Sequence, residues 1–360
     1  MRGLRMLCIP VLLMAATVPL TWGQALPSPD APPASNFPDT PPPATPLPQE
    51  TLHVTTNLVT EYFTVRDKHN ALIPYLKESA CTVWENKQPQ KITSFRTEAN
   101  EPLSLGIMID TSGSQENLLP MEEDSAKRFL KQVLRPKDQA FVLNFDVGVD
   151  LDQDYTNDIS ELDHAIDGLQ INTAGGGGSI GVPGLGQGTI PTMGAPKGTV
   201  LYDAVYQASR DKMAGQTGRK AMILLTDGQD EGSDHRLRDA VAAAQDSDTI
   251  VYVILIANRG FYGGYGMGYT GADAMRRLTD QTGGRVIDVG SNGRKLENAF
   301  EQIEEELRTQ YVLQYTPTDK YMDGSFRRVA VFCKQDGKYL KVQARKGYFA
   351  IPNPGSGSDQ

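Results

Sequence analysis

The stretch that decides the fold is Leu103-Ser104-Leu105-Gly106-Ile107-Met108-Ile109, which continues directly into Asp110-Thr111-Ser112-Gly113-Ser114. Its first seven residues are almost continuously apolar, which is typical of a strand buried on both faces of a parallel sheet. The next five bring a carboxylate, three hydroxyls and a glycine. We therefore predict a buried strand that ends in a polar loop at Asp110.

The polar loop carries the ligand types that hard cations prefer. Asp110, Ser112 and Ser114 place a carboxylate and two hydroxyls at alternate positions, where they can converge on one point. Oxygen ligands of this kind suit Mg²⁺, whereas a zinc or copper site would be expected to include His or Cys. Ser, Thr, Gly and Asp are also ordinary turn residues. The loop therefore predicts a metal site only together with partners elsewhere in the chain.

Residues 101–310 alternate between apolar strands and helices. We expect strands at 103–109, 140–145, 221–225, 250–256 and 286–289, and helices at 118–134, 159–169, 201–213, 237–244 and 296–307. This alternation predicts an α/β fold with a doubly wound, mostly parallel sheet that is covered on both faces. The polar run 150–155 is expected as an antiparallel edge strand. Ligands of such sheets bind beyond the carboxyl ends of the strands, where Asp110 is expected.

Two further residues are expected at the same edge of the sheet as Asp110. Thr199 precedes a helix in the segment Lys197–Ala204, and Asp227 follows the buried strand residues Met222–Leu225. The alternative is an ordinary helix N-cap at Thr199 beside a hydroxyl-rich turn. The predicted metal site consists of Asp110, Ser112, Ser114, Thr199 and Asp227.

The order Asp-x-Ser-x-Ser, then Thr, then Asp resembles the metal-ion-dependent adhesion site (MIDAS) of von Willebrand factor type A (VWA) domains. The segment Leu225–Gly228 is also similar to that family. The resemblance implies that the two serines bind a divalent cation directly, and that Thr199 and Asp227 bind it directly or through water. It implies Mg²⁺, with Mn²⁺ or Ca²⁺ as alternatives, and a protein partner that offers an acidic side chain to the open coordination position.

Both flanks of the α/β domain, 51–98 and 311–350, show the alternation of short β-strands. We expect them to pack together as a small all-β unit. The segments Trp84–Phe95 and Tyr311–Pro317 resemble the flanks of a family of exported bacterial proteins called acidobacterial VWFA-related. The chain departs from that family at Asn86-Lys87, where an Asp-Gly turn is usual, and this departure puts the local turn in doubt.

The N-terminus has the pattern of a secretory signal, with Arg2 and Arg5 before an apolar run. We predict a signal peptide over 1–23, a Pro-rich linker over 24–50 and a loose tail over 351–360. The alternative is a membrane anchor, although the apolar run is short for a span. The mature protein is expected to be soluble and either periplasmic or secreted.

Export would place Cys81 and Cys333 in an oxidising compartment, where disulfides persist. Both cysteines fall in strand-like flanks, and Cys81 stands where the resembling family has a large apolar residue. Two interpretations remain open. The cysteines either form a disulfide that joins the two flanks or are two separate buried thiols.

Several other residues have structural interpretations. Asp203 is expected either as a charged residue in the first turn of a helix or as a residue that orients a metal ligand without binding the ion itself. Asp230 lies in an acidic run that is either a solvated loop or a second cation site. We expect Trp84 in the core of the β unit and the glutamates of Glu301–Glu306 on a solvated helix face. The glycine-rich insertions 173–196 and 260–269 are expected as surface loops, and the tyrosines of the second could also contact a partner.

Charge and motifs limit the classes of function. A net charge of -9 over 360 residues argues against binding to nucleic acid or to anionic membranes. An enzyme that uses Asp110 for phosphoryl transfer would want a second carboxylate where Ser112 stands. The sequence has no His-Glu-x-x-His, the motif of a zinc protease. We predict a non-enzymatic adhesion protein; the alternatives are a structural or assembly component of the cell envelope with a stabilising metal, and a metal-dependent hydrolase.

Overall fold

The computed structural model describes residues 58–97, 101–171, 198–257 and 271–350. The predicted signal peptide, the Pro-rich linker, both glycine-rich insertions and the tail 351–360 lie outside the described residues. Within the described ranges, no helix is long and apolar enough to cross a membrane.

A six-stranded sheet forms the centre of the α/β domain, with strand order β10-β9-β8-β5-β6-β7. All neighbouring pairs are parallel except β6 and β7. This arrangement confirms both the mostly parallel sheet and the antiparallel edge strand that the sequence predicts. The strands are β5 (Leu103–Asp110), β6 (Gln139–Phe145), β7 (Val149–Thr156), β8 (Arg219–Thr226), β9 (Ile250–Leu255) and β10 (Val286–Asp288).

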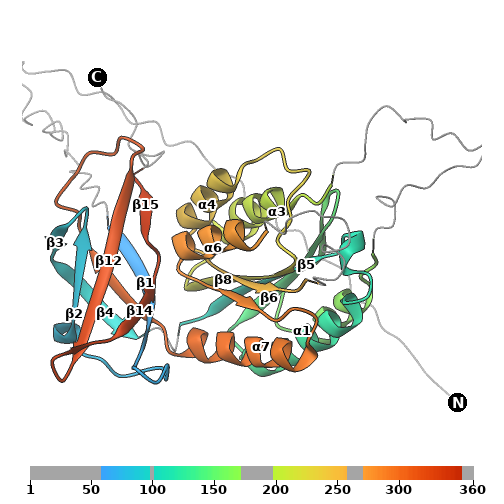
Figure 1. Ribbon diagram of the computed structural model, residues 1–360, viewed down its shortest axis with the longest axis horizontal. Helices are drawn as coiled ribbons and strands as arrows, with labels where there is room; N and C mark the ends of the chain where they lie inside the picture. The colour runs from blue at the N-terminus through green and yellow to red at the C-terminus, as the bar shows by residue number, and fades with distance from the viewer. Residues whose placement is uncertain (1–57, 98–100, 172–197, 258–270, 351–360) are drawn as a thin grey trace, which may run out of the picture. The chain divides into compact units, whose positions relative to one another are not determined.

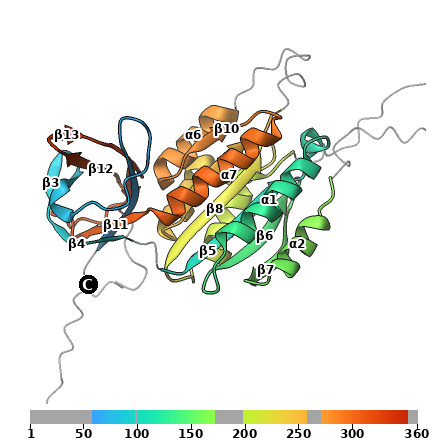
Figure 2. The same ribbon diagram turned by 90° about the horizontal axis from the view of Figure 1, so that it is seen from below.

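Helices cover both faces of this sheet (Figures 1 and 2). One face carries α1 (Leu119–Val133), α2 (Ile159–Asp167) and α7 (Gly293–Arg308), and the other carries α3 (Leu201–Gln207), α4 (Leu237–Asp246) and α6 (Gly271–Thr282). A π-helical turn, η4 (Ala208–Met213), continues α3. Helix α6 is not among the helices expected from the sequence, because Met275 and Leu278 are its only large apolar residues.

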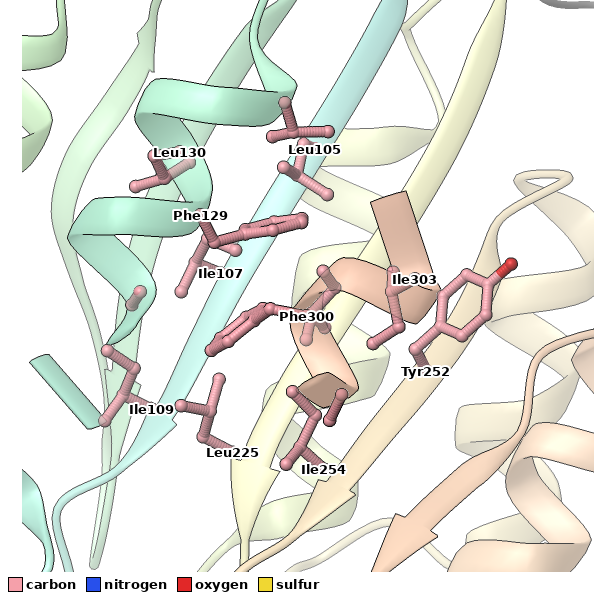
Figure 3. Packing of buried hydrophobic residues seen from close by; sticks show 14 of the residues in the cluster. Leu105, Ile107, Ile109, Phe129, Leu130, Leu225, Tyr252, Ile254, Phe300 and Ile303 are labelled. Atoms are coloured by element: carbon pink, nitrogen blue, oxygen red, sulfur yellow. The ribbon is translucent and has the colours of Figure 1, made fainter. Parts of the chain in front are cut away.

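Successive side chains of β5 point to opposite faces of the central sheet, so the strand contributes to the core on both faces. Ile107 and Ile109 pack toward α1 and α7, where the rings of Phe129 and Phe300 stack with centroids 4.7 Å apart (Figure 3). Met108 packs on the opposite face. Full burial of side chains of this size stabilises the fold by roughly 1.5–3 kcal/mol each. The carboxyl end of β5 is therefore held between two packed layers.

The flanking segments form two further antiparallel sheets. One has the order β14-β1-β11-β4 and the other the order β13-β12-β2-β3, with β15 (Gly347–Phe349) paired to β12. Both sheets combine strands from before and after the α/β domain, since β1 pairs with β11 and β2 pairs with β12. The remaining bounds are β1 (Val59–Arg66), β2 (Cys81–Glu85), β3 (Gln88–Gln90), β4 (Ile92–Thr97), β11 (Tyr311–Tyr315), β12 (Phe326–Gln335), β13 (Lys338–Tyr339) and β14 (Lys341–Ala344).

A disulfide joins Cys81 to Cys333 across the β2–β12 pair. Both side chains point into the core between the two antiparallel sheets. The hairpin from β2 to β3 turns at Asn86 and Lys87, and both residues have positive φ angles of 46° and 67°. Two consecutive positive φ angles are typical of a tight hairpin turn. The turn thus forms without the Asp-Gly pair of the resembling family.

Two expectations about side-chain burial are wrong. Trp84 is 37% exposed, because it alternates along β2 with the inward-facing Val83 and so faces outward. Glu306 is fully buried, whereas the other glutamates of its helix face are at least partly exposed. Glu306 can be buried because Arg66 and Arg285 both contact its Oε1, at 2.6 and 2.7 Å.

Candidate functional site

Asp110 is the last residue of β5 and is completely buried. Its Oδ1 accepts a 3.0 Å hydrogen bond from the amide of Ser112, which turns the chain out of the strand. Its Oδ2 accepts a 2.6 Å hydrogen bond from the hydroxyl of Thr226, the last residue of the neighbouring strand β8. Because β5 and β8 are parallel and adjacent, their carboxyl ends meet at the same edge of the sheet.

The two serines extend this contact to the loop after β8. A short 3₁₀ turn, η2 (Gly113–Gln115), follows Ser112. The turn places the Oγ of Ser112 3.1 Å from the Oγ of Ser114. Ser114 in turn donates a 2.7 Å hydrogen bond to Oδ2 of Asp227. Asp110, Ser112, Ser114 and Asp227 are therefore joined in one chain of hydrogen bonds.

Thr199 reaches this edge of the sheet through its backbone. Its carbonyl accepts hydrogen bonds of 3.0 and 3.1 Å from the amides of Glu231 and Gly232, in the loop that follows Asp227. The next amide, of Val200, donates to the carbonyl of Asp146 at 2.7 Å. The Thr199 segment is thus fastened to the loop after β8 and to the turn after β6.

Asp203 and Asp230 connect α3 with the loop after β8. Each carboxylate belongs to one of these segments and accepts hydrogen bonds from the other. Asp203, in α3, accepts hydrogen bonds from the amides of Asp234 and His235, both 2.9 Å long. Asp230 accepts a 3.1 Å hydrogen bond from the amide of Tyr202 at the start of α3. Both carboxylates therefore fasten the loop after β8 to the helix that follows Thr199.

Burial and charge make Asp110 costly to ionise. Burial and, to a smaller extent, the nearby charge of Asp227 together raise the pKa of Asp110 to about 7. Two carboxylates held close together in a buried site repel each other unless a positive charge lies between them. A divalent cation would supply that charge, so the pair fits the predicted cation.

The donor set also fits a hard cation. It offers carboxylate and hydroxyl oxygens with neither His nor Cys, as Mg²⁺, Mn²⁺ and Ca²⁺ prefer. Within the described ranges, no group of three or more His, Cys, Asp or Glu side chains is gathered closely enough to hold a metal ion. A cation at this edge would therefore depend on the serine hydroxyls as well as on Asp110 and Asp227.

Three residues near the site were not predicted. Thr226 bonds Asp110 directly, and the buried Gln115 places its Nε2 3.5 Å from the Ser114 hydroxyl. Glu122 is fully buried in α1, and the charges of Asp110 and Asp227 contribute to raising its pKa. The available signal was the position of Glu122, an acidic residue in line with the apolar positions Leu119 and Ala126 of the helix.

No protein-family model matches the sequence, and neither does any curated protein. Among solved structures, the chain is similar to a von Willebrand factor type A protein from Catenulispora acidiphila, with a TM-score of 0.42 and 14% identity over 77% of this chain and 75% of that one. It is similar to proximal thread matrix protein 1 of the mussel byssus, with a TM-score of 0.45 and 14% identity over 62% of this chain. A further match is BatB from Bacteroides thetaiotaomicron, with a TM-score of 0.40 and 14% identity over 57% of this chain and 98% of that one.

The chain spans about half the length of the mussel protein, covering 51% of it. Another structure of that mussel protein has a zinc-occupied MIDAS motif.

Proposed function

We propose that this chain is an exported, non-enzymatic binding protein with a VWA-type α/β domain. It recognises a protein partner through a divalent cation held by Asp110, Ser112, Ser114, Thr199 and Asp227. The observation that carries the proposal is the hydrogen-bonded chain from Asp110 through both serines to Asp227. It brings together residues that the sequence separates by more than a hundred positions.

The charges at this edge suit the capture of an acidic ligand. The two carboxylates balance the charge of a divalent cation, while the hydroxyls of Ser112, Ser114 and Thr199 add no negative charge. A cation bound there would supply an electrophilic centre for an oxygen of the partner. An aspartate or glutamate side chain of a protein partner is the ligand of matching chemistry, and Mg²⁺ is the cation that we propose.

An exported location is supported by the disulfide between Cys81 and Cys333. Disulfides of this kind persist in oxidising compartments and are rare in the cytosol. The signal-like N-terminus points the same way. We therefore place the binding event in the periplasm or outside the cell.

Isothermal titration of Mg²⁺ and Mn²⁺ into the protein tests the cation site. We expect one ion to bind the wild type and no ion to bind Ser112→Ala, because the variant loses one of the hydroxyls of the set. Ser160→Ala is the matched control, since Ser160 is exposed at the start of α2. A wild-type protein that binds neither ion would contradict the proposal.

Binding to an acidic peptide tests the recognition step. We expect an immobilised peptide array to retain the protein at glutamate-containing sequences in the presence of Mn²⁺, and to lose it on chelation or when Gln replaces Glu. Asp110→Ala should abolish this binding and leave the fold intact. A folded Asp110→Ala protein that still bound the array in a cation-dependent way would rule out this site as the recognition centre.

A further inference from the structure

Glu122 occupies a core position of α1. Leu119 and Ala126, three positions before it and four after it, both belong to the core under the helix. Glu122 itself is fully buried. Among the described residues, neither of its carboxylate oxygens has a hydrogen-bond partner. A buried carboxylate without a partner costs free energy unless a nearby positive charge offsets it.

The other buried glutamates of the described ranges all contact arginine. Glu61 contacts Arg345 at 2.8 Å, and Glu85 contacts Arg327 at 3.3 Å. Glu306 contacts two arginines. The chain thus supplies a counter-charge wherever it buries a glutamate, except at Glu122, for which no ion pair is found within the described residues.

The surroundings of Glu122 point to the site at the carboxyl end of β5. Burial raises the pKa of Glu122 well above its usual range, and the charges of Asp110 and Asp227 raise it further. Gln115 lies between the site and the core, since its Nε2 approaches both the Ser114 hydroxyl and the carbonyl of Ile256. Its Oε1 is buried and, within the described residues, also lacks a hydrogen-bond partner.

We propose that Glu122 is a positioning residue of the cation site, whose buried carboxylate strengthens cation binding at Asp110 and Asp227 without coordinating the ion. This inference rests on the proposed function. Glu122 does not serve as a direct ligand, because the described residues contain no close group of three carboxylate, His or Cys side chains. The bound cation would provide Glu122 with a counter-charge, as arginine does for the other buried glutamates.

The test replaces Glu122 by Gln and measures Mn²⁺ affinity by calorimetry and melting temperature without cation. We expect the affinity to fall roughly tenfold or more, because a buried charge acts on the ion with little screening. We expect the melting temperature without cation to stay the same or rise, because the variant removes an uncompensated carboxylate. Glu116→Gln is the matched control: Glu116 is exposed, so the loss of its charge is screened and should leave the affinity unchanged.

A core-filling role for Glu122 predicts the opposite pair of results. Glu122→Gln would then lower the melting temperature and leave the Mn²⁺ affinity at the wild-type value, and this outcome would overturn the inference while leaving the proposed function in place. A wild-type protein that binds no cation would overturn both.

A measurement on the unmodified chain covers the case in which Glu122→Gln does not fold. We expect Mg²⁺ saturation to shift the ¹³C carboxyl resonance of Glu122 and to leave that of Glu116 in place. A Glu122 resonance that did not move, in a protein shown to bind Mg²⁺, would overturn the inference without any variant.

Discussion

The hydroxyl of Ser114 donates a 2.7 Å hydrogen bond to Oδ2 of Asp227, although 113 positions separate the two residues. The bond links the loop after β5 to the loop after β8. Each loop is also held by its own aspartate, since Asp110 accepts from the amide of Ser112 and Asp227 accepts from the amide of Gln229. The proposed ligands are therefore arranged before any cation arrives, so binding need not order either loop.

Asp110→Asn tests the contribution of the Asp110 charge, because asparagine has nearly the same shape as aspartate but is neutral. We expect the variant to weaken Mn²⁺ binding by roughly a hundredfold or more, because an amide replaces a carboxylate beside the ion. The free energy of unfolding without cation should not fall, since the substitution relieves the repulsion from Asp227 and the amide oxygen can still accept a hydrogen bond. Calorimetry and urea unfolding measure the two quantities.

Asp150→Asn is the control for this substitution, because Asp150 is exposed on the edge strand β7. It removes the same charge from the same sheet and should leave both quantities at their wild-type values. Wild-type Mn²⁺ affinity in Asp110→Asn would show that the ion binds elsewhere.

Gly232→Ala tests how the loop after β8 positions Thr199. A Cβ added at Gly232 would lie 2.2 Å from the carbonyl oxygen of Gly198, so the loop would have to move. We expect a loss of Mn²⁺ affinity of roughly tenfold and a destabilisation of about 1–3 kcal/mol. Gly215→Ala is the control, because nothing lies within 4 Å of its added Cβ. Unchanged affinity in a folded Gly232→Ala protein would show that Thr199 contributes little to the cation site.

The parts of the site that the sequence predicts all follow strands or precede a helix. Asp110 and Asp227 could be placed together because apolar runs of Val, Ile, Leu and Met identify parallel strands, whose carboxyl ends share one edge. The spacing of Ser112 and Ser114 then brings their hydroxyls to the same edge. Thr226 ends the same strand that Asp227 follows, but nothing in its sequence context indicates that it donates to Asp110.

Other features depend on contacts that sequence periodicity cannot specify. Glu122 occupies an apolar position of α1, and its acidic neighbours make it resemble a residue of a solvated face. Glu306 is expected on a solvated face, but two arginines from distant parts of the chain allow it to be buried. Trp84 is expected in the core, but its register along β2 turns it outward. Contacts with distant residues decide burial at Glu306, and strand register decides it at Trp84.

Removal of the Cys81–Cys333 disulfide should destabilise the β unit. The bond joins two residues 252 positions apart in the sequence, and such cross-links typically stabilise proteins by about 2–4 kcal/mol. We expect the double variant Cys81→Ser/Cys333→Ser to unfold at lower urea concentration and to bind Mn²⁺ with wild-type affinity, since both cysteines lie outside the cation site. Reduction of the wild type should reproduce the shift. A double variant as stable as the oxidised wild type would contradict this.

The buried pair of Glu61 and Arg345 predicts a pH dependence of stability that is independent of the cation site. Burial raises the pKa of Glu61 from 4.5 to about 7, and the attraction of Arg345 only partly offsets this rise. Between these values the folded protein retains a proton that the unfolded chain has lost. The stability from Glu61 is therefore fully present below pH 4.5 and is lost as the pH rises through about 7.

The loss amounts to about 3 kcal/mol for a shift of this size. Urea unfolding at about pH 5 and about pH 8 measures it, and Glu61→Gln should flatten the difference because its amide does not titrate. Glu78→Gln is the control, since Glu78 is exposed in the same β unit and should leave the difference unchanged. If Glu61→Gln kept the full difference between the two pH values, the dependence would have to come from other buried groups, and Arg345 would hold Glu61 ionised in the folded protein.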